Sequence, residues 1–283
     1  MGAVFEVIER RYAVLPRWPG NFARIIGQMR QPQIIAHRGA SGHAPENTLA
    51  AYRLAIELGA HFIEADLQST RDGHIVAFHD AELQRTTNGR GVVAESTLDE
   101  VRSIDAGRWF DRDFAGQRVP TLEEVLGLGR ESEVGFYFQL RSGYSAEFGR
   151  LLVRAVRDMD AMLRVVVVSP AAADIEELRK LEDGVVTGIL FSERSPDALE
   201  LAAQSGARQF CLREDLVTGE LVNRAHGAGL LTVAWTVNAP ARMRELVATG
   251  VDRMVTDFPD RLRATIEDSD PGRNAAGWIQ HPH

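Results

Sequence analysis

Among the first 80 residues of the chain, two of the histidines, one of the arginines and two of the carboxylates each follow an apolar run. They are His37 and Arg38, the acidic pair Glu64 and Asp66, and His79. Two imidazoles can share the duties of general acid and general base. Two carboxylates one residue apart on a strand point to the same face and can hold one hard cation. With an arginine that suits a phosphate group, this set has the chemistry needed to cleave a phosphodiester.

Each of these residues alone also has a plain structural interpretation. A single histidine is most often a core residue satisfied by hydrogen bonds, and Arg38 could form an ion pair with Glu46 or Asp66. The acidic pair could lie on a solvated edge, but the apolar neighbours Phe62 and Ile63 indicate a buried strand. Unpaired carboxylates are costly there and need a cation or an arginine. The combination therefore favours a metal site flanked by an acid–base couple.

The elements that must position these residues follow from the alternation of apolar patterns. Runs typical of strands occupy 33–37, 61–67, 134–140, 163–168, 185–190, 209–212, 230–235 and 252–256. Helical patterns separate them at 47–58, 121–128, 145–159, 172–181, 196–203, 218–228, 240–248 and 259–266. Eight strands alternating with eight helices predict an α/β protein with a parallel (β/α)₈ TIM barrel. Active groups of such barrels gather at the C-terminal ends of the strands, where His37 and the acidic pair fall.

A doubly wound open sheet is the alternative fold. It usually has fewer strands and needs a glycine-rich phosphate loop, of which residues 39–42 are a poor version. One connection is unusually long, because residues 68–120 separate the second strand from its helix. We predict an insertion there, with a hairpin turn at 71–74. The barrel domain would span 31–267. It would follow an N-terminal helical extension (1–30), which could also mediate oligomer formation, and precede a polar tail (268–283).

The composition is ordinary for a globular protein, with 45% hydrophobic and 25% charged residues. A net charge of −8 argues against binding nucleic acid or an anionic membrane through a basic surface. The single cysteine, Cys211, excludes a disulfide framework and a zinc site made of several cysteines. No run of 18 apolar residues is present, so we expect no integral membrane segment. The N-terminus lacks an apolar signal region, and we expect a cytoplasmic protein.

Eight short motifs, taken in order, resemble the glycerophosphodiester phosphodiesterase family. They are His37-Arg38-Gly39, Pro45-Glu46-Asn47-Thr48, Glu64-Ala65-Asp66, His79-Asp80, Arg85-Thr86-Thr87, Val119-Pro120-Thr121-Leu122, Trp235-Thr236-Val237-Asn238 and Thr256-Asp257-Phe258-Pro259. Each motif is short, but the ordered set is highly specific and spans roughly residues 33–262. The resemblance implies the barrel fold and the hydrolysis of a glycerophosphodiester to glycerol phosphate and an alcohol.

The resemblance also implies roles for individual residues. His37 and His79 would be the acid–base couple, with the two duties not assigned between them. Glu46 and Asn47 would support the site, the alternative being that they only cap the following helix. Trp235, at the end of a predicted strand, would face the apolar side of a glycerol or similar alcohol, unless it is a plain core tryptophan.

A divalent cation, Ca²⁺ or Mg²⁺ with Mn²⁺ as a further option, would be held by Glu64 and Asp66, and Arg38 would hold the phosphate. The family carries Glu-x-Lys at the end of the third strand, where this chain has Gln139 and Arg141. Gln139 still offers a carbonyl oxygen as a ligand, but the site loses one negative charge and should bind a cation more weakly. Arg141 keeps a positive charge for the substrate phosphate.

Because Gln139 stands where the family has a glutamate, functions other than diester hydrolysis also have to be considered. The chain could be a catalytically weak or silent homologue that acts as a binding or regulatory protein, although the two histidines, Arg38 and the acidic pair are all retained. A sphingomyelinase D-like enzyme acting on lysophospholipids would share the fold and a similar site, but this chain lacks disulfide cysteines and a signal peptide. A sugar-phosphate barrel would need glycine in the loops after the last two strands, which contain none.

Overall fold

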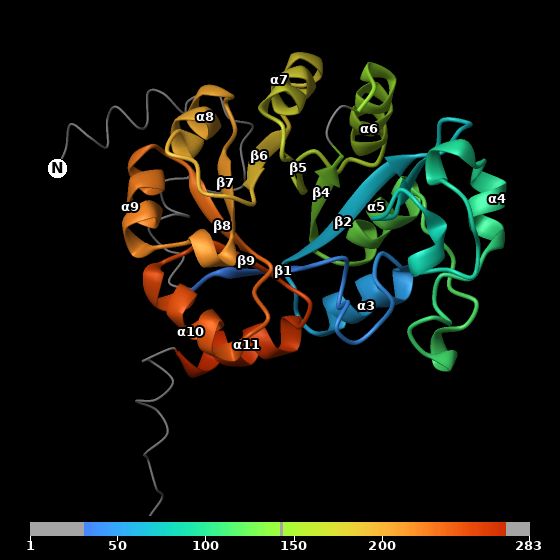
Figure 1. Ribbon diagram of the computed structural model, residues 1–283, viewed down its shortest axis with the longest axis horizontal. Coiled ribbons are helices and arrows are strands. Elements are labelled where there is room, and N and C mark those ends of the chain that lie inside the picture. Colours follow the sequence, from blue (N-terminus) through green and yellow to red (C-terminus); the bar gives the residue numbers. More distant parts are fainter. Residues whose placement is uncertain (1–30, 142–143, 270–283) are drawn as a thin grey trace, which may run out of the picture.

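The computed structural model describes residues 31–141 and 144–269. The predicted N-terminal helical extension (1–30) lies outside the described residues, as does the predicted tail apart from its first two residues. Within the described part, strands and helices alternate along the chain (Figure 1).

A closed barrel of eight parallel strands forms the centre of the described part (Figure 1). Its strands are β1 (Gln33–Ala36), β2 (Phe62–Ser69), β4 (Gly135–Leu140), β5 (Val165–Ser169), β6 (Val186–Phe191), β7 (Gln209–Arg213), β8 (Leu231–Trp235) and β9 (Arg253–Thr256). The ring closes because β1 pairs in parallel with both β2 and β9. The predicted barrel is therefore confirmed, and the open sheet is excluded.

Helices follow the strands and cover the outside of the barrel. They are α3 (Leu49–Glu57), α5 (Leu122–Glu131), α6 (Ala146–Asp158), α7 (Ala172–Leu181), α8 (Ala198–Gln204), α9 (Gly219–Gly227), α10 (Pro240–Thr249) and α11 (Pro259–Asp268). Helix α3 begins two residues later than predicted, because the Thr48 hydroxyl caps it by accepting from the Ala51 amide at 3.2 Å. Nowhere in residues 31–141 or 144–269 is a helix both long and apolar enough to cross a membrane.

Apolar clusters on both faces of the strands stabilise the barrel. Large clusters fill the space between strands and helices, and a smaller one inside the barrel includes Phe62, Tyr137 and Val166. Cys211 belongs to the inner cluster, and burial raises the pKa of its thiol to about 12, so it acts as a small apolar side chain. The acidic pair shares the inward face of β2 with Phe62, because alternate strand residues point the same way.

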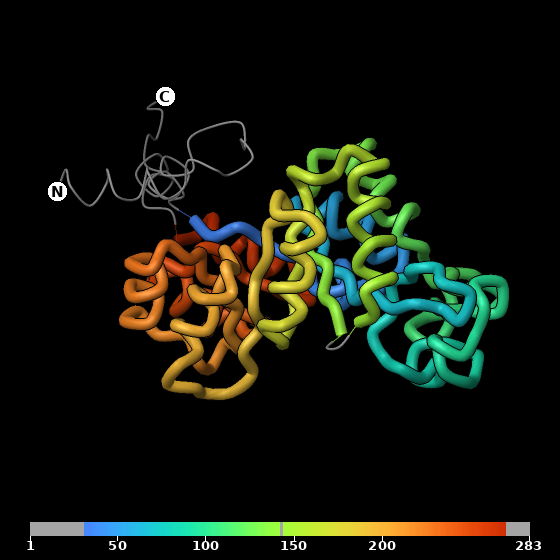
Figure 2. The backbone as a smooth tube through the Cα atoms, turned by 90° about the horizontal axis from the view of Figure 1, so that it is seen from above, coloured from blue at the N-terminus to red at the C-terminus, as the bar shows by residue number. Residues whose placement is uncertain are grey.

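The connection from β2 to α5 forms a lobe beside the barrel, drawn in cyan to green in Figure 2. It contains β3 (Ile75–Ala77), which pairs antiparallel with β2 as the predicted turn requires. Three short 3₁₀ turns (Leu83–Arg85, Val93–Glu95, Arg112–Phe114) and α4 (Leu98–Ser103) follow. The lobe has its own buried apolar centre, so it is a folded insertion rather than a loose loop.

Candidate active site

The turn after β1 presents His37 and Arg38 at the C-terminal mouth of the barrel. Arg38 and Gly39 both adopt left-handed backbone conformations, with φ of 54° and 83°, which is uncommon for arginine. Glycine is needed at the second position because a Cβ would lie 2.6 Å from the carbonyl carbon of Ala51. The turn directs the backbone N–H of Arg38 to Glu64 Oε2, 2.8 Å away. A buried carboxylate is thereby tied to the loop that carries the histidine.

His37 is bound by Asp257, to which the sequence analysis gave no role. Asp257 Oδ1 lies 2.6 Å from His37 Nδ1 and accepts from the Ser41 hydroxyl at 3.0 Å, while Oδ2 accepts from Asn238 Nδ2 at 2.5 Å. Burial alone would lower the pKa of His37, but the bond to Asp257 and the charge of Glu64 raise it above its ordinary value. The only signal for this pair in the sequence is the family-like motif that contains Asp257.

Asp257→Asn is expected to lower the pKa of His37, because it removes the carboxylate that favours the charged imidazole. The limb of the pH–rate profile that His37 controls should therefore move to lower pH. Movement of the acidic limb would identify His37 as the general base, and movement of the alkaline limb as the general acid. The measurement is kcat/KM from about pH 5 to about pH 9 in both proteins.

Asp260→Asn is the matched control for this variant. Asp260 makes a similar bond, at 2.9 Å, to the exposed His43 outside the site. Its loss should leave both limbs of the profile in place. An active Asp257→Asn protein with an unshifted profile would show that His37 titrates independently of Asp257.

The acidic pair is almost completely buried, with Glu64 and Asp66 each 4% exposed. Asp66 Oδ2 accepts from Asn47 Nδ2 at 3.0 Å and lies 3.1 Å from Arg38 Nε. Glu64 Oε1 has no hydrogen-bond partner among the described residues. Burial and the nearby Asp66 carboxylate raise the pKa of Glu64 to about 7. A buried carboxylate oxygen without a donor fits a bound cation.

Gln139 lies beside Asp66, because the two residues are directly paired across β2 and β4. It therefore occupies the position expected of a third ligand but supplies an amide in place of a carboxylate. The described residues contain no group of three or more His, Cys, Asp or Glu side chains placed to hold a metal. Two carboxylates and one amide thus lie on neighbouring strands, and their role as ligands stays a prediction.

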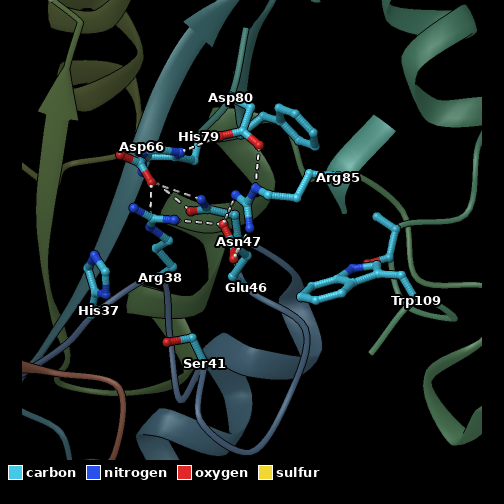
Figure 3. Close-up of polar contacts among 12 residues, drawn as sticks. His37, Arg38, Ser41, Glu46, Asn47, Asp66, His79, Asp80, Arg85 and Trp109 are labelled. Carbon is cyan, nitrogen blue, oxygen red and sulfur yellow. Dashed lines mark hydrogen bonds and ion pairs between the residues drawn. The ribbon is translucent and has the colours of Figure 1, made fainter. Parts of the chain in front are cut away.

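Charged side chains connect the loops of the two histidines (Figure 3). Arg38 Nη1 donates to Glu46 Oε1 at 2.8 Å, and both Glu46 oxygens accept from Arg85, at 2.7 and 2.8 Å. Arg85 also binds Asp80, whose Oδ1 lies 2.7 Å from His79 Nδ1. The ion pairs that the sequence suggested as an alternative role of Arg38 are therefore present in the structure. Arg85 and Asp80 fall in the family-like motifs, but sequence reasoning gave neither a role.

Asn47 faces the site instead of capping α3. Its backbone is left-handed, with φ of 53°, and its Oδ1 accepts from the Tyr52 hydroxyl at 2.9 Å while Nδ2 binds Asp66. The cap is the next residue, Thr48. The helix-cap alternative for Glu46 and Asn47 is thus wrong, and both side chains contact charged groups of the site.

The segment that carries His79 is held through three consecutive backbone carbonyls. Gln68 Nε2 donates to the carbonyls of Phe78 and Asp80 at 2.6 and 2.7 Å. Arg141 Nη1 donates to the carbonyl of His79 at 3.2 Å and to Gln68 Oε1 at 3.4 Å. Arg141 is therefore next to the histidine loop, and its contact with a substrate phosphate stays a prediction.

Trp235 is the last residue of β8 and packs against the cluster inside the barrel. Its side chain is half-buried, and its indole Nε1 is buried without a hydrogen-bond partner in the part of the chain that the structure describes. The ring covers the apolar interior from the C-terminal side. This position suits both interpretations, a core tryptophan and a wall of the substrate site.

The closed barrel and its polar mouth place the chain among the α/β-barrel enzymes. The family model described as "Glycerophosphoryl diester phosphodiesterase family" matches residues 37–261. The chain belongs to this family.

Named relatives agree with this assignment. A "Glycerophosphodiester phosphodiesterase" of Caldanaerobacter subterraneus subsp. tengcongensis is 35% identical over 231 residues, which cover 81% of this chain and 95% of the relative. A Bacillus subtilis protein of the same name is 31% identical over 246 residues, covering 80% of this chain and 83% of the relative. The structure of an Oleispira antarctica phosphodiesterase, in complex with the product sn-glycerol-3-phosphate, has a TM-score of 0.78 and 26% identity, covering 84% of this chain and 97% of the other.

Proposed function

We propose that the protein hydrolyses a glycerophosphodiester to glycerol phosphate and an alcohol. The observation that carries this proposal is the meeting, at one end of the barrel, of two histidine–aspartate pairs, Arg38 and the buried acidic pair. Acid–base groups, a cation site and an arginine are the groups that phosphodiester cleavage needs. The family match and the two relatives named for this activity support the same reaction.

His37 and His79 would share the two proton transfers. One ring takes the proton of the attacking oxygen, which belongs to water or to the neighbouring glycerol hydroxyl. The other ring gives a proton to the oxygen of the leaving alcohol as its bond to phosphorus breaks. Attack by the glycerol hydroxyl would give a cyclic phosphate first. Asp257 and Asp80 bind Nδ1 of the two rings, which leaves Nε2 of each ring for these transfers.

A divalent cation, Ca²⁺, Mg²⁺ or Mn²⁺, would be held by Glu64, Asp66 and Gln139. The fit rests on oxygen donors, which hard cations prefer, and on the unpartnered Glu64 Oε1. When bound, the cation supplies positive charge for the phosphate oxygens. Arg38, between the acidic pair and Glu46, would orient the phosphate.

The test is a release assay over a panel of glycerophosphodiesters and lysophospholipids, with Ca²⁺, Mg²⁺ or Mn²⁺ supplied. We expect glycerol phosphate and the free alcohol from at least one glycerophosphodiester. Cleavage confined to lysophospholipids would instead indicate a sphingomyelinase D-like specificity. No cleavage of any compound, by a folded protein that binds metal, would support the silent binding protein.

A further inference from the structure

Arg85 binds two carboxylates that come from different parts of the structure. Its Nη1 and Nη2 donate to Glu46 Oε2 and Oε1 at 2.8 and 2.7 Å, and its Nε binds Asp80. Glu46 precedes α3 on the barrel, whereas Asp80 follows β3 where the lobe begins. Figure 3 shows the guanidinium between these two side chains. All three of its nitrogens therefore have carboxylate partners, although 46% of the side-chain surface is exposed.

The backbone of Arg85 is fixed by the apolar centre of the lobe. Arg85 ends the 3₁₀ turn Leu83–Arg85, and Leu83 is buried in that centre. The Leu83 N–H donates to the carbonyl of Gly91 at 2.9 Å, and the Leu83 carbonyl accepts from the Thr87 hydroxyl at 2.6 Å. The lobe therefore sets where the guanidinium lies, as precise positioning of a functional group requires.

Asp80 joins Arg85 to the acid–base couple. Its Oδ1 lies 2.7 Å from His79 Nδ1, and its Oδ2 binds Arg85. Burial alone would raise the pKa of Asp80, but the bonds from Arg85 and His79 hold it below its ordinary value. Within the described residues, these two side chains are the partners of the Asp80 carboxylate. Without Arg85, Oδ2 would lose its anchor and the carboxylate could turn together with the imidazole.

We propose that Arg85 is a positioning residue that fixes the imidazole of His79 through Asp80. The inference rests on the proposed function and adds a residue to its machinery. A partner at Nδ1 determines which ring nitrogen carries the proton and how the ring is oriented. A carboxylate held at both oxygens therefore keeps Nε2 of His79 in place for proton transfer. Glu46 anchors the other end of Arg85 on the barrel.

The same contacts distinguish this role from one in phosphate binding. Glu46 Oε1 accepts from Arg38 as well as from Arg85, so Arg85 could act on the phosphate through Arg38. Arg38, however, also pairs with Asp66 at 3.1 Å and would stay anchored without Arg85. The Asp80 carboxylate has no such second anchor. The loss of Arg85 should therefore affect the proton transfer, and so kcat, more than substrate binding.

Arg85→Ala is expected to lower kcat about 10- to 100-fold, because a misplacement of about 1 Å in a reacting group costs up to about 10²-fold. KM should change less than about threefold. The measurement is steady-state kinetics on the best diester of the panel. Arg102→Ala is the matched control. Arg102 also lies in the lobe and binds both oxygens of one carboxylate, Glu124 on α5, but it has no contact with the site. Its loss should leave kcat unchanged.

A double-mutant cycle shows whether Arg85 acts through His79. In the His79→Ala background, Arg85→Ala should lower kcat less than about twofold, because the ring that it positions is already absent. A further loss as large as in the parent background would overturn the proposal. An unchanged kcat with a raised KM in the single variant would equally overturn it, because Arg85 would then act on substrate binding.

Nitrogen NMR of the histidine rings gives a reading that does not need turnover. The His79 signals are assigned by their loss in His79→Ala. The neutral ring should carry its proton on Nδ1 in the parent and divide it between both nitrogens in Arg85→Ala. Identical His79 signals in the two proteins would overturn the proposal.

The NMR reading also separates this proposal from the proposed function. If the parent cleaves no diester, the proposed function fails, and the ring signals still decide whether Arg85 positions His79. If Arg85→Ala does not fold, Arg85→Lys replaces it in every measurement. Lysine keeps the charge, but one ammonium group cannot bind both carboxylates as the planar guanidinium does, so the same losses are expected.

Discussion

Replacing either His37 or His79 by alanine is expected to lower kcat by about 10²–10⁴-fold, because each variant loses one of the two proton transfers. Each ring is already oriented by a carboxylate at its Nδ1, at 2.6 Å from Asp257 and 2.7 Å from Asp80. Neither ring belongs to the apolar clusters, so the fold should persist. The measurement is the steady-state rate on the best diester of the panel, with the Tm of each variant recorded alongside.

His43→Ala is the matched control, because His43 is also paired with an aspartate but lies outside the site. The kcat of the double variant of His37 and His79 should be little lower than that of the less active single variant, because the effects of residues that act as a unit are not additive. A near-normal rate in either single variant would remove that histidine from the mechanism. An equal loss in His43→Ala would mean that the assay reports on folding.

Local spacing was enough to predict the barrel and the acidic pair. Eight alternating units appear directly in the apolar pattern, and Glu64 and Asp66 share a face because a strand has a period of two. The same reasoning put Gln139 at the end of its strand, and the pairing with Asp66 agrees with that placement. These features depend on neighbours in the chain or on the regular geometry of a barrel.

The partners of the site residues could not be predicted in this way. Asp257 is 220 residues from His37, and the two meet only because β9 closes on β1. Arg85 comes from the lobe, whose short irregular turns carry no period that a sequence could reveal. For Arg38 the sequence left phosphate binding and ion pairing open. The structure shows that Arg38 forms ion pairs with both Glu46 and Asp66. A substrate phosphate would therefore have to share the Arg38 guanidinium with these carboxylates.

Removing divalent cations is expected to abolish turnover, and returning them to restore it. Without a cation, Glu64 and Asp66 place two buried carboxylates where the proposed reaction brings an anionic phosphate, and like charges repel. The measurement is activity in excess chelator, followed by addition of Ca²⁺, Mg²⁺ or Mn²⁺ and a metal analysis of the purified protein. Full activity in chelator, from protein that contains no metal, would exclude the cation from the mechanism.

Gln139→Glu is expected to lower the metal concentration for half-maximal activity by about tenfold, because a third carboxylate beside Asp66 strengthens an oxygen-ligand site. Its effect on kcat is a separate matter, since the new charge also repels the phosphate. Calorimetric metal titration provides a reading that does not depend on turnover. In chelator the variant should have a lower Tm than the parent, because three carboxylates, two of them buried, then face one another without a cation.

Gln204→Glu is the matched control for this experiment. It adds the same charge on α8, where Gln204 is exposed and pairs with Glu200, so any general effect of charge on metal binding appears there too. If Gln139→Glu needs as much metal as the parent, the side chain at this position is not beside the cation, although β4 places it next to Asp66. If the parent and Gln139→Glu both bind metal and neither cleaves a diester, the missing carboxylate does not explain the inactivity, and the chain is better described as a binding protein on an enzyme fold.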